Sequence, residues 1–147
     1  MGQSRMNILL IEDNQDHAEL TLKALANGDL TSRVHWVKDG EEALDFLHHR
    51  GRFADPTAAP RPCLILLDFK LPKVDGHEVL QEIKGDRTLR SIPVVMLTNA
   101  DRGEEIAASY RAGANSVVTK PIGFPEFVER IRTVEGYWLR TSRLPEA

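Results

Sequence analysis

Short apolar runs alternate with segments of helical periodicity along the chain. The apolar runs read as buried strands, and they cover residues 7–11, 33–37, 63–67, 94–97 and 116–118. Between and after these runs, apolar side chains recur every three or four positions, which predicts helices that each bury one face. The helices are expected over 16–26, after Asp39, after Gly76, around 106–110 and from Phe124 onward. Because strands that alternate with helices favour right-handed crossovers, the pattern predicts an α/β fold, (βα)5, with a doubly wound five-stranded parallel sheet.

Turn-forming residues separate these elements and set the expected domain limits. The longest irregular segment, 48–62, contains Pro56, Pro60 and Pro62 and reads as a surface loop. A length of 147 residues fits one domain. We therefore expect a single domain over 7–139, an N-terminal tail over 1–6 and a C-terminal tail over 140–147, with little room for a second module.

The charge balance and the single cysteine narrow the class of protein. Acidic residues number 22 and basic residues 19, so the formal charge is −3. A charge this small and negative does not indicate binding to nucleic acid or to an anionic membrane. No apolar run approaches the roughly 18 residues of a membrane span. The lone cysteine, Cys63, excludes an internal disulfide and a Cys-rich zinc site. We expect a cytoplasmic protein with neither nucleic acid nor membrane as a partner.

Polar side chains follow four of the five expected strands, at the point where each strand ends. Glu12 and Asp13 come after the first strand, Asp68 after the third, Thr98 after the fourth and Lys120 after the fifth. Ligands of an open parallel α/β sheet bind outside the carboxyl ends of its strands, so we expect these side chains to converge. Taken singly, each has an ordinary explanation as a helix cap, a turn residue or a solvated lysine. Five of them at strand ends favour a functional site.

The residue types at these strand ends indicate chemistry with a divalent cation. Three clustered carboxylates repel one another, and Mg2+ relieves that repulsion because it prefers oxygen ligands. The acidic loop disfavours a bound mononucleotide such as FMN, and no GxxxxGK[ST] phosphate-binding loop occurs. An ionised carboxylate can accept a phosphoryl group when the charge is neutralised. In this interpretation Asp68 is the nucleophile, Lys120 and Thr98 bind phosphoryl oxygens, and Glu12 and Asp13 help to hold Mg2+.

Five short motifs carry a resemblance to a known family. They lie at expected strand ends between about Asn7 and Leu139, and they are Ile11-Glu12-Asp13, Leu66-Leu67-Asp68, Leu71-Pro72-Lys73-Val74-Asp75-Gly76, Leu97-Thr98 and Lys120-Pro121. Together they resemble the response-regulator receiver domain of two-component signalling, which has a CheY-like variant of the flavodoxin-like fold. Within that family, the long loop, the turn after Asp68 and the stand-alone domain are most similar to single-domain regulators that partner bacterial phytochrome histidine kinases.

The resemblance implies a role for each residue of the site. The implied metal ligands are Glu12, Asp13, Asp68 and the backbone carbonyl of Lys70. Asp68 is then the phosphoacceptor, Thr98 the switch hydroxyl and Lys120 the characteristic lysine of the family. The resemblance further implies a phosphoacceptor in a phosphorelay rather than a classical enzyme. It also implies a sensor histidine kinase as partner, a homodimer formed near the last helix, and a cis peptide bond before Pro121.

Three features depart from the usual pattern of the family. Val117 stands three residues before the lysine, where the family has a switch aromatic, so we expect output through helix and loop movement or dimerisation. Asn99 follows the switch threonine, where small residues are usual. Lys70 and Ala100 occupy positions that gate hydrolytic water in the family. We hypothesise that Lys70 makes an extra contact to the phosphoryl group and alters the lifetime of the acyl phosphate.

Other function classes are weighed against this interpretation. An aspartyl-phosphate phosphatase of the haloacid dehalogenase type also uses a strand-end aspartate with Mg2+, but it needs a second acid where Lys70 stands. A pseudo-receiver is a protein-interaction module without phosphorylation, and it is expected to lack part of the acidic pocket that this chain keeps. The five histidines show no metal-ligand spacing, although His17 follows the acidic loop closely enough for a kinase contact. Tyr137-Trp138-Leu139 reads either as a cap on the core or as an oligomer contact.

Overall fold

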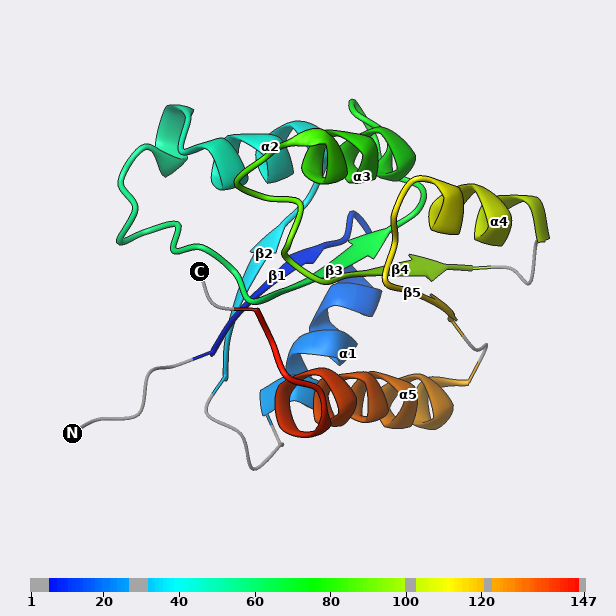
Figure 1. Ribbon diagram of the computed structural model, residues 1–147. Helices are drawn as coiled ribbons and strands as arrows, with labels where there is room; N and C mark the ends of the chain where they lie inside the picture. Colours follow the sequence, from blue (N-terminus) through cyan, green and yellow to red (C-terminus); the bar gives the residue numbers. More distant parts are fainter. Residues whose placement is uncertain (1–5, 27–31, 100–102, 121–122, 146–147) are drawn as a thin grey trace.

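A parallel sheet forms the centre of the protein (Figure 1). The computed structural model describes residues 6–26, 32–99, 103–120 and 123–145. The strands are β1 (Met6–Ile11), β2 (Ser32–Val37), β3 (Leu64–Asp68), β4 (Val94–Thr98) and β5 (Ser116–Thr119). All pairs are parallel and the order is β2-β1-β3-β4-β5, which confirms the predicted doubly wound sheet.

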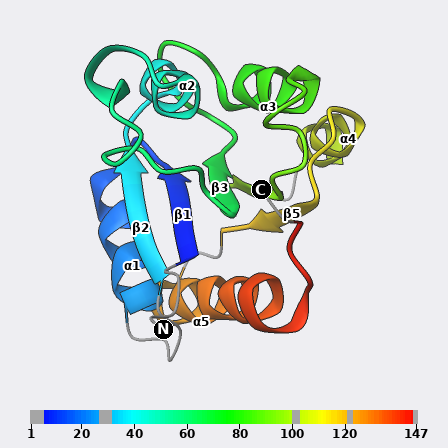
Figure 2. The same ribbon diagram turned by 60° about the vertical axis from the view of Figure 1, so that its left-hand side comes forward.

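Helices cover both faces of the sheet, as Figures 1 and 2 show. Over the described ranges they are α1 (Gln15–Ala26), α2 (Gly40–His48), α3 (Gly76–Gly85), α4 (Gly103–Arg111) and α5 (Phe124–Gly136). The last helix continues into a π-helical turn, Tyr137–Thr141. One apolar cluster joins α1 and α5 to the sheet, and the other joins α2 and α3 to the opposite face. Every residue of β3 and β4 is buried because both faces of these central strands are covered.

Side-chain caps and one glycine set the ends of several helices. The Asn14 side chain accepts a hydrogen bond from the His17 backbone N–H (3.0 Å) at the start of α1. The Asp39 side chain accepts one from the Glu42 N–H (2.8 Å) at the start of α2, as its position predicted. After α4 the chain turns at Gly113, whose φ of 105° favours glycine. The caps and the glycine thus set where each of these helices begins or where the chain turns after it.

Ala107, Tyr110 and Phe124 are apolar positions at helical spacing in the last two helices, yet all three are exposed. Tyr110 is 51% exposed and Ala107 is exposed as well, since α4 lies beside the edge strand β5 and buries only Ser109. The Tyr110 hydroxyl instead accepts a hydrogen bond from the Val117 N–H (3.2 Å), which caps the open side of β5. Phe124 is 60% exposed because it is the first residue of α5, where the helix does not pack on the sheet.

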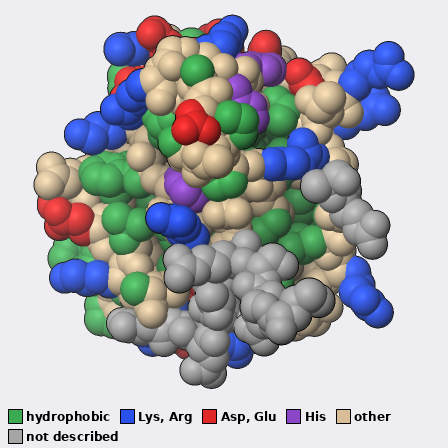
Figure 3. Space-filling model, turned by 90° about the vertical axis from the view of Figure 1, so that its left-hand side faces the viewer, with side chains coloured by type: hydrophobic (Ala, Val, Ile, Leu, Met, Phe, Trp, Pro, Cys, Tyr) green, Lys and Arg blue, Asp and Glu red, His purple; other side chains and the backbone are tan. Residues whose placement is uncertain are grey.

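The long segment between α2 and β3 lies at the opposite edge of the sheet from the strand ends described above. It contains a short 3-10 turn, Gly51–Phe53. The His49 Nε2 lies 2.8 Å from the Ala59 carbonyl oxygen, and Arg61 donates to the Thr88 carbonyl. Figure 3 views this face and shows basic side chains mostly at its rim, with histidine and acidic groups between apolar patches.

The regular structure extends slightly beyond the expected domain limits. β1 begins at Met6, and the π-helical turn ends at Thr141, so the division into one domain and two tails stays a prediction. No helix in the described ranges is both long enough and apolar enough to cross a membrane. Ala100 and the peptide bond before Pro121 lie outside the described residues.

Candidate functional site

The predicted residues stand at the carboxyl ends of parallel strands and so share one edge of the sheet. Asp68 is the last residue of β3 at the centre of the sheet, and Thr98 is the last residue of β4 beside it. Glu12 directly follows β1, and Lys120 directly follows β5. Asp68, Glu12, Thr98 and Lys120 are all buried, whereas Asp13 is exposed. The convergence predicted from the strand order is therefore present.

The Lys120 ammonium links two of the carboxylates. Its Nζ lies 2.5 Å from Glu12 Oε1 and 3.3 Å from Asp68 Oδ2. The side chains of these three residues are at most 5% exposed, so the ion pairs are shielded from water. A buried lysine is tolerated here because carboxylates compensate its charge. The shorter contact shows that the ammonium is bound mainly to Glu12.

The carboxylates fit a hard divalent cation. Glu12, Asp13 and Asp68 can each offer one oxygen, and these oxygens lie within 4.8 Å of one another. The Oδ1 atom of Asp68 is buried and has no hydrogen-bond partner among the described residues. A buried carboxylate oxygen without a donor is costly unless a cation or a water molecule satisfies it. This donor set matches the oxygen ligands that Mg2+ prefers.

The surroundings of Asp68 disfavour its ionised form. Burial is the largest cause, and the neighbouring Glu12 carboxyl acts in the same direction; together they raise the pKa of Asp68 to about 8, although Lys120 lowers it. The geometry explains the balance, because the ammonium lies closer to Glu12 than to Asp68. A cation bound to the carboxylates would favour the ionised form that a nucleophile needs.

Thr98 connects the site to α4. Its hydroxyl is buried and donates to Oε2 of Glu105, in the first turn of that helix, at 3.0 Å. Thr98 follows Leu97, the residue paired with Asp68 in the sheet. The hydroxyl therefore stands between the strand end that carries Asp68 and a helix on the outer layer.

Backbone contacts fix the two acidic strand ends. A Cβ atom on Gly76 would lie 2.1 Å from the Asp68 carbonyl oxygen, so the loop after β3 can fold back on itself only with glycine there. The Gly76 N–H donates to the Phe69 carbonyl at 3.1 Å. On the other strand, the Trp36 indole Nε1–H donates to the Glu12 carbonyl at 2.8 Å. These contacts hold the carboxylates in place before any ligand arrives.

Sequence reasoning missed the contribution of three residues that support the site. His17, on α1, lies 3.3 Å from the Lys120 ammonium through its Nδ1. Glu105 accepts a hydrogen bond from Thr98, and the Trp36 indole donates one to the Glu12 carbonyl. A single polar residue on an amphipathic helix looks like part of a solvated face, so no motif signalled the first two. The exposed Lys70 lies two residues after Asp68, and its carbonyl as a metal ligand stays a prediction.

This geometry agrees with comparisons to known proteins. The profile of the response regulator receiver domain matches residues 8–132. The chain belongs to this family. Members of the family accept a phosphoryl group and are not classical enzymes, which agrees with the motifs at the strand ends.

Individual receiver domains are similar over nearly the whole chain. The probable methanogenesis regulatory protein FilR2 of Methanothrix harundinacea is 40% identical over 94% of this chain and 86% of its own length. Response regulator Rcp1 of Synechocystis is 37% identical over 95% and 93%. The crystal structure of the phosphorylated cyanobacterial phytochrome response regulator RcpA has a TM-score of 0.92 and 40% identity, covering 97% of this chain and all of that one. A Mn2+-bound form of Rcp1 has a TM-score of 0.89 and 36% identity, covering 96% and 99%. The relation to phytochrome response regulators is thereby confirmed.

Proposed function

We propose that this receiver domain accepts a phosphoryl group from a histidine kinase on Asp68 in a Mg2+-dependent reaction. The observation that carries the proposal is the Asp68 carboxylate itself. One of its oxygens binds the Lys120 ammonium, and the other is buried without a hydrogen-bond partner among the described residues, beside Glu12 and Asp13. One oxygen of the carboxylate thus faces the Lys120 ammonium, and the other lies beside two further carboxylates.

The residues of the site divide the work of phosphoryl transfer. An Asp68 oxygen attacks phosphorus, a P–O bond forms, the P–N bond to the kinase histidine breaks, and its electron pair stays on the departing imidazole. Lys120 then binds a phosphoryl oxygen, and the Thr98 hydroxyl donates to another. Glu12, Asp13, Asp68 and the Lys70 carbonyl would hold Mg2+, which would supply positive charge to neutralise the phosphoryl oxygens. The Mn2+-bound form of the relative Rcp1 supports a metal in this position.

Two alternatives are less well supported. A phosphatase of the haloacid dehalogenase type needs an acid two residues after its nucleophile, where this chain has the exposed Lys70. A pseudo-receiver has no need of a complete acidic pocket, yet Glu12, Asp13, Asp68 and Lys120 are all assembled here. The phosphorylated structure of the relative RcpA also favours the phosphoacceptor.

Intact-mass measurement after incubation with acetyl phosphate and Mg2+ tests the proposal. The protein should gain one phosphoryl group that hydroxylamine removes, and Asp68→Asn should abolish the gain. Asp75→Asn, which changes a neighbouring aspartate whose side chain makes no capping hydrogen bond to α3, serves as the matched control and should retain it. A wild-type protein that gains no mass from acetyl phosphate or from a phosphorylated kinase is a pseudo-receiver.

We further propose that the kinase partner is of the bacterial phytochrome class, because RcpA is described as a phytochrome response regulator. The exposed Phe124, four residues after Lys120, borders a hollow of about 330 Å3 that Leu20 and Lys23 of α1 also line, which suits contact with a partner helix. Phe124→Ala should slow transfer from a phosphorylated phytochrome kinase while leaving phosphorylation by acetyl phosphate unchanged. Equal rates with the kinase would overturn this docking surface.

For output we propose movement of α4 together with formation of a homodimer in the cytoplasm. Thr98 is bonded to Glu105 of α4, so recruitment of its hydroxyl to a phosphoryl oxygen would release that helix. At the far end of α5, Tyr137 is 52% exposed and its ring packs edge-on against Trp138, which makes it a candidate dimer contact. Sedimentation of the wild type and Tyr137→Glu, each with and without phosphorylation, tests the dimer; a monomer in every state would exclude it.

A further inference from the structure

The buried ammonium of Lys120 has a third partner besides the two carboxylates. The Nδ1 atom of His17 lies 3.3 Å from Lys120 Nζ. A lysine ammonium carries three N–H donors. Glu12 Oε1, Asp68 Oδ2 and His17 Nδ1 therefore give the ammonium one acceptor for each of its donors. The lysine side chain is only 3% exposed, so water has little access to its ammonium.

The contact assigns the form of the histidine ring. An ammonium can only donate, so the Nδ1 atom that faces it is the acceptor and the ring proton resides on Nε2. Nδ1 also lies 4.0 Å from Glu12 Oε1, too far for a hydrogen bond between the two. The imidazole ring of His17 and the Glu12 carboxylate are thus two separate acceptors for the same ammonium.

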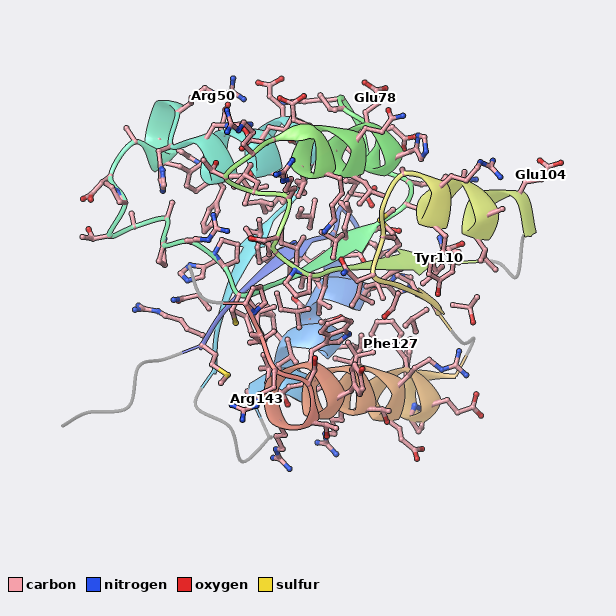
Figure 4. All side chains as sticks on the ribbon, viewed as in Figure 1. Arg50, Glu78, Glu104, Tyr110, Phe127 and Arg143 are labelled. Carbon is pink, nitrogen blue, oxygen red and sulfur yellow. The ribbon has the colours of Figure 1, made fainter. Side chains whose placement is uncertain are left out.

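His17 itself is held from several sides. Its backbone N–H donates to Asn14 Oδ1 at 3.0 Å, and its carbonyl accepts from the buried Thr21 hydroxyl at 2.8 Å. Its ring lies against Phe127 of α5, with ring centroids 5.8 Å apart and planes inclined by 28°. Figure 4 shows Phe127 rising from α5 toward the sheet. The ring is therefore a fixed point between α1, α5 and the end of β5.

We propose that His17 is a positioning residue that holds the Lys120 ammonium in place for the phosphoryl group. The inference rests on the proposed phosphoacceptor function and deepens it. When Asp68 is phosphorylated, one N–H of Lys120 turns from the Asp68 oxygen to a phosphoryl oxygen. The other two N–H groups remain bonded to Glu12 and His17, so the ammonium binds the phosphoryl oxygen while these two hydrogen bonds hold its position. Without His17, one buried N–H lacks a fixed acceptor and the ammonium is less well placed.

Two substitutions separate the acceptor of His17 from its ring. In His17→Asn, Oδ1 stands where Nδ1 stood but the aromatic ring is lost. In His17→Phe, the ring stays against Phe127 but the acceptor is lost. His35→Phe, on β2, is the matched control, since that histidine contacts Asn7 and Phe46 rather than the site. Each protein is examined for phosphorylation rate with acetyl phosphate and Mg2+, and for the protection of its lysine ammonium protons by NMR after labelling with ζ-15N lysine.

We expect the loss of the acceptor to impair phosphorylation and the loss of the ring to have little effect. His17→Phe should phosphorylate about three- to tenfold more slowly and lose the protected Lys120 ammonium signal, whereas His17→Asn should keep the signal and most of the rate. The Lys84 ammonium, which binds Arg90 O, Ile92 O and Asn115 Oδ1, is the internal reference and should not change. The opposite order, with Phe near wild type and Asn impaired, would show that His17 acts only through packing.

The two readouts also separate this inference from the proposed function. If the wild type takes up a phosphoryl group and both variants equal it in rate and in the Lys120 signal, the positioning role is wrong and the phosphoacceptor function stands. If the wild type takes up no phosphoryl group, the phosphoacceptor function fails. The ammonium signal then still decides whether His17 holds Lys120.

Discussion

The Thr98 hydroxyl donates to the Glu105 carboxylate at 3.0 Å and so joins the end of β4 to α4. Thr98 is only 2% exposed, so this hydrogen bond is sheltered from water. A phosphoryl group on Asp68 would compete with Glu105 for the same hydroxyl. The bond would therefore oppose phosphorylation of Asp68, and a contact from Thr98 to the phosphoryl group would have to replace it.

Removal of the competing carboxylate should make the phosphorylated state easier to reach. Glu105→Ala is expected to bind the phosphoryl analogue beryllofluoride about fivefold more tightly in the presence of Mg2+, a gain of about 1 kcal/mol. Isothermal titration calorimetry measures this affinity. The control is Glu104→Ala, which changes the neighbouring exposed glutamate of the same helix (labelled in Figure 4). Equal affinity in Glu105→Ala and wild type would show that Thr98 is not restrained by Glu105.

A side chain at Gly76 should disrupt both stability and the site. Its Cβ would lie 2.1 Å from the Asp68 carbonyl and 2.6 Å from that of Phe69, both of them backbone atoms that cannot move alone. Gly76→Ala should lower the free energy of unfolding by at least about 2 kcal/mol and reduce phosphorylation of Asp68. Chemical denaturation measures the first effect and intact mass the second.

Gly85 offers the matched control for this substitution. It ends the same helix, α3, and a Cβ there meets nothing within 4 Å. Gly85→Ala should leave stability unchanged or raise it by up to about 1 kcal/mol, because alanine favours helix more than glycine does. Equal loss of stability in both variants would contradict the role of the close approach at Gly76.

Lys70 should affect the lifetime of the acyl phosphate. It is exposed and lies two residues beyond Asp68, and the hypothesis is that its ammonium contacts a phosphoryl oxygen. Lys70→Asn is expected to change the rate of phosphate release by about twofold to tenfold, as expected for one exposed charge-assisted contact. The control is Lys73→Asn in the same loop, where the lysine ammonium lies 3.7 Å from Asp39 Oδ2. An unchanged rate in Lys70→Asn would exclude the contact.

His35 should contribute to acid sensitivity of the fold. Burial, and secondarily the charge of Arg33, lower the pKa of His35 below its ordinary value of 6.5. The unfolded chain therefore takes up a proton at higher pH than the folded protein does. Stability is unaffected by this group above the unfolded-state pKa and falls as the pH drops through 6.5, until the folded-state pKa is reached.

Substitution of the histidine should flatten that dependence. His35→Phe is expected to lose less stability than the wild type between pH 7 and pH 5, as followed by thermal unfolding. Arg33→Gln should act in the same direction but more weakly, since Arg33 is the smaller of the two causes. A steeper loss in His35→Phe than in the wild type would contradict the assigned direction.

The strand ends could be predicted from the sequence, and their surroundings could not. Glu12, Asp68 and Lys120 were expected together because parallel strands present their carboxyl ends at one edge, and the chain order of strands and helices was unambiguous. Helical periodicity does not show where a helix extends past the sheet, so it could not show that Tyr110 and Phe124 are exposed. Contacts between elements distant in sequence, such as those of His17 and Glu105, depend on packing angles that no local pattern encodes.

The anchoring of α4 has a consequence for the local stability of the protein. That helix buries only Ser109, and its described side-chain bonds to the neighbouring strands come from Thr98–Glu105 and Tyr110–Val117; Figure 4 shows Tyr110 directed from α4 toward β5. Little apolar surface is exposed when such a helix opens, so its amide hydrogens should exchange with solvent through local openings, well before those of α3. The helix bonded to the Thr98 hydroxyl is then also the part of the outer layer that can change its arrangement while the rest of the fold stays intact.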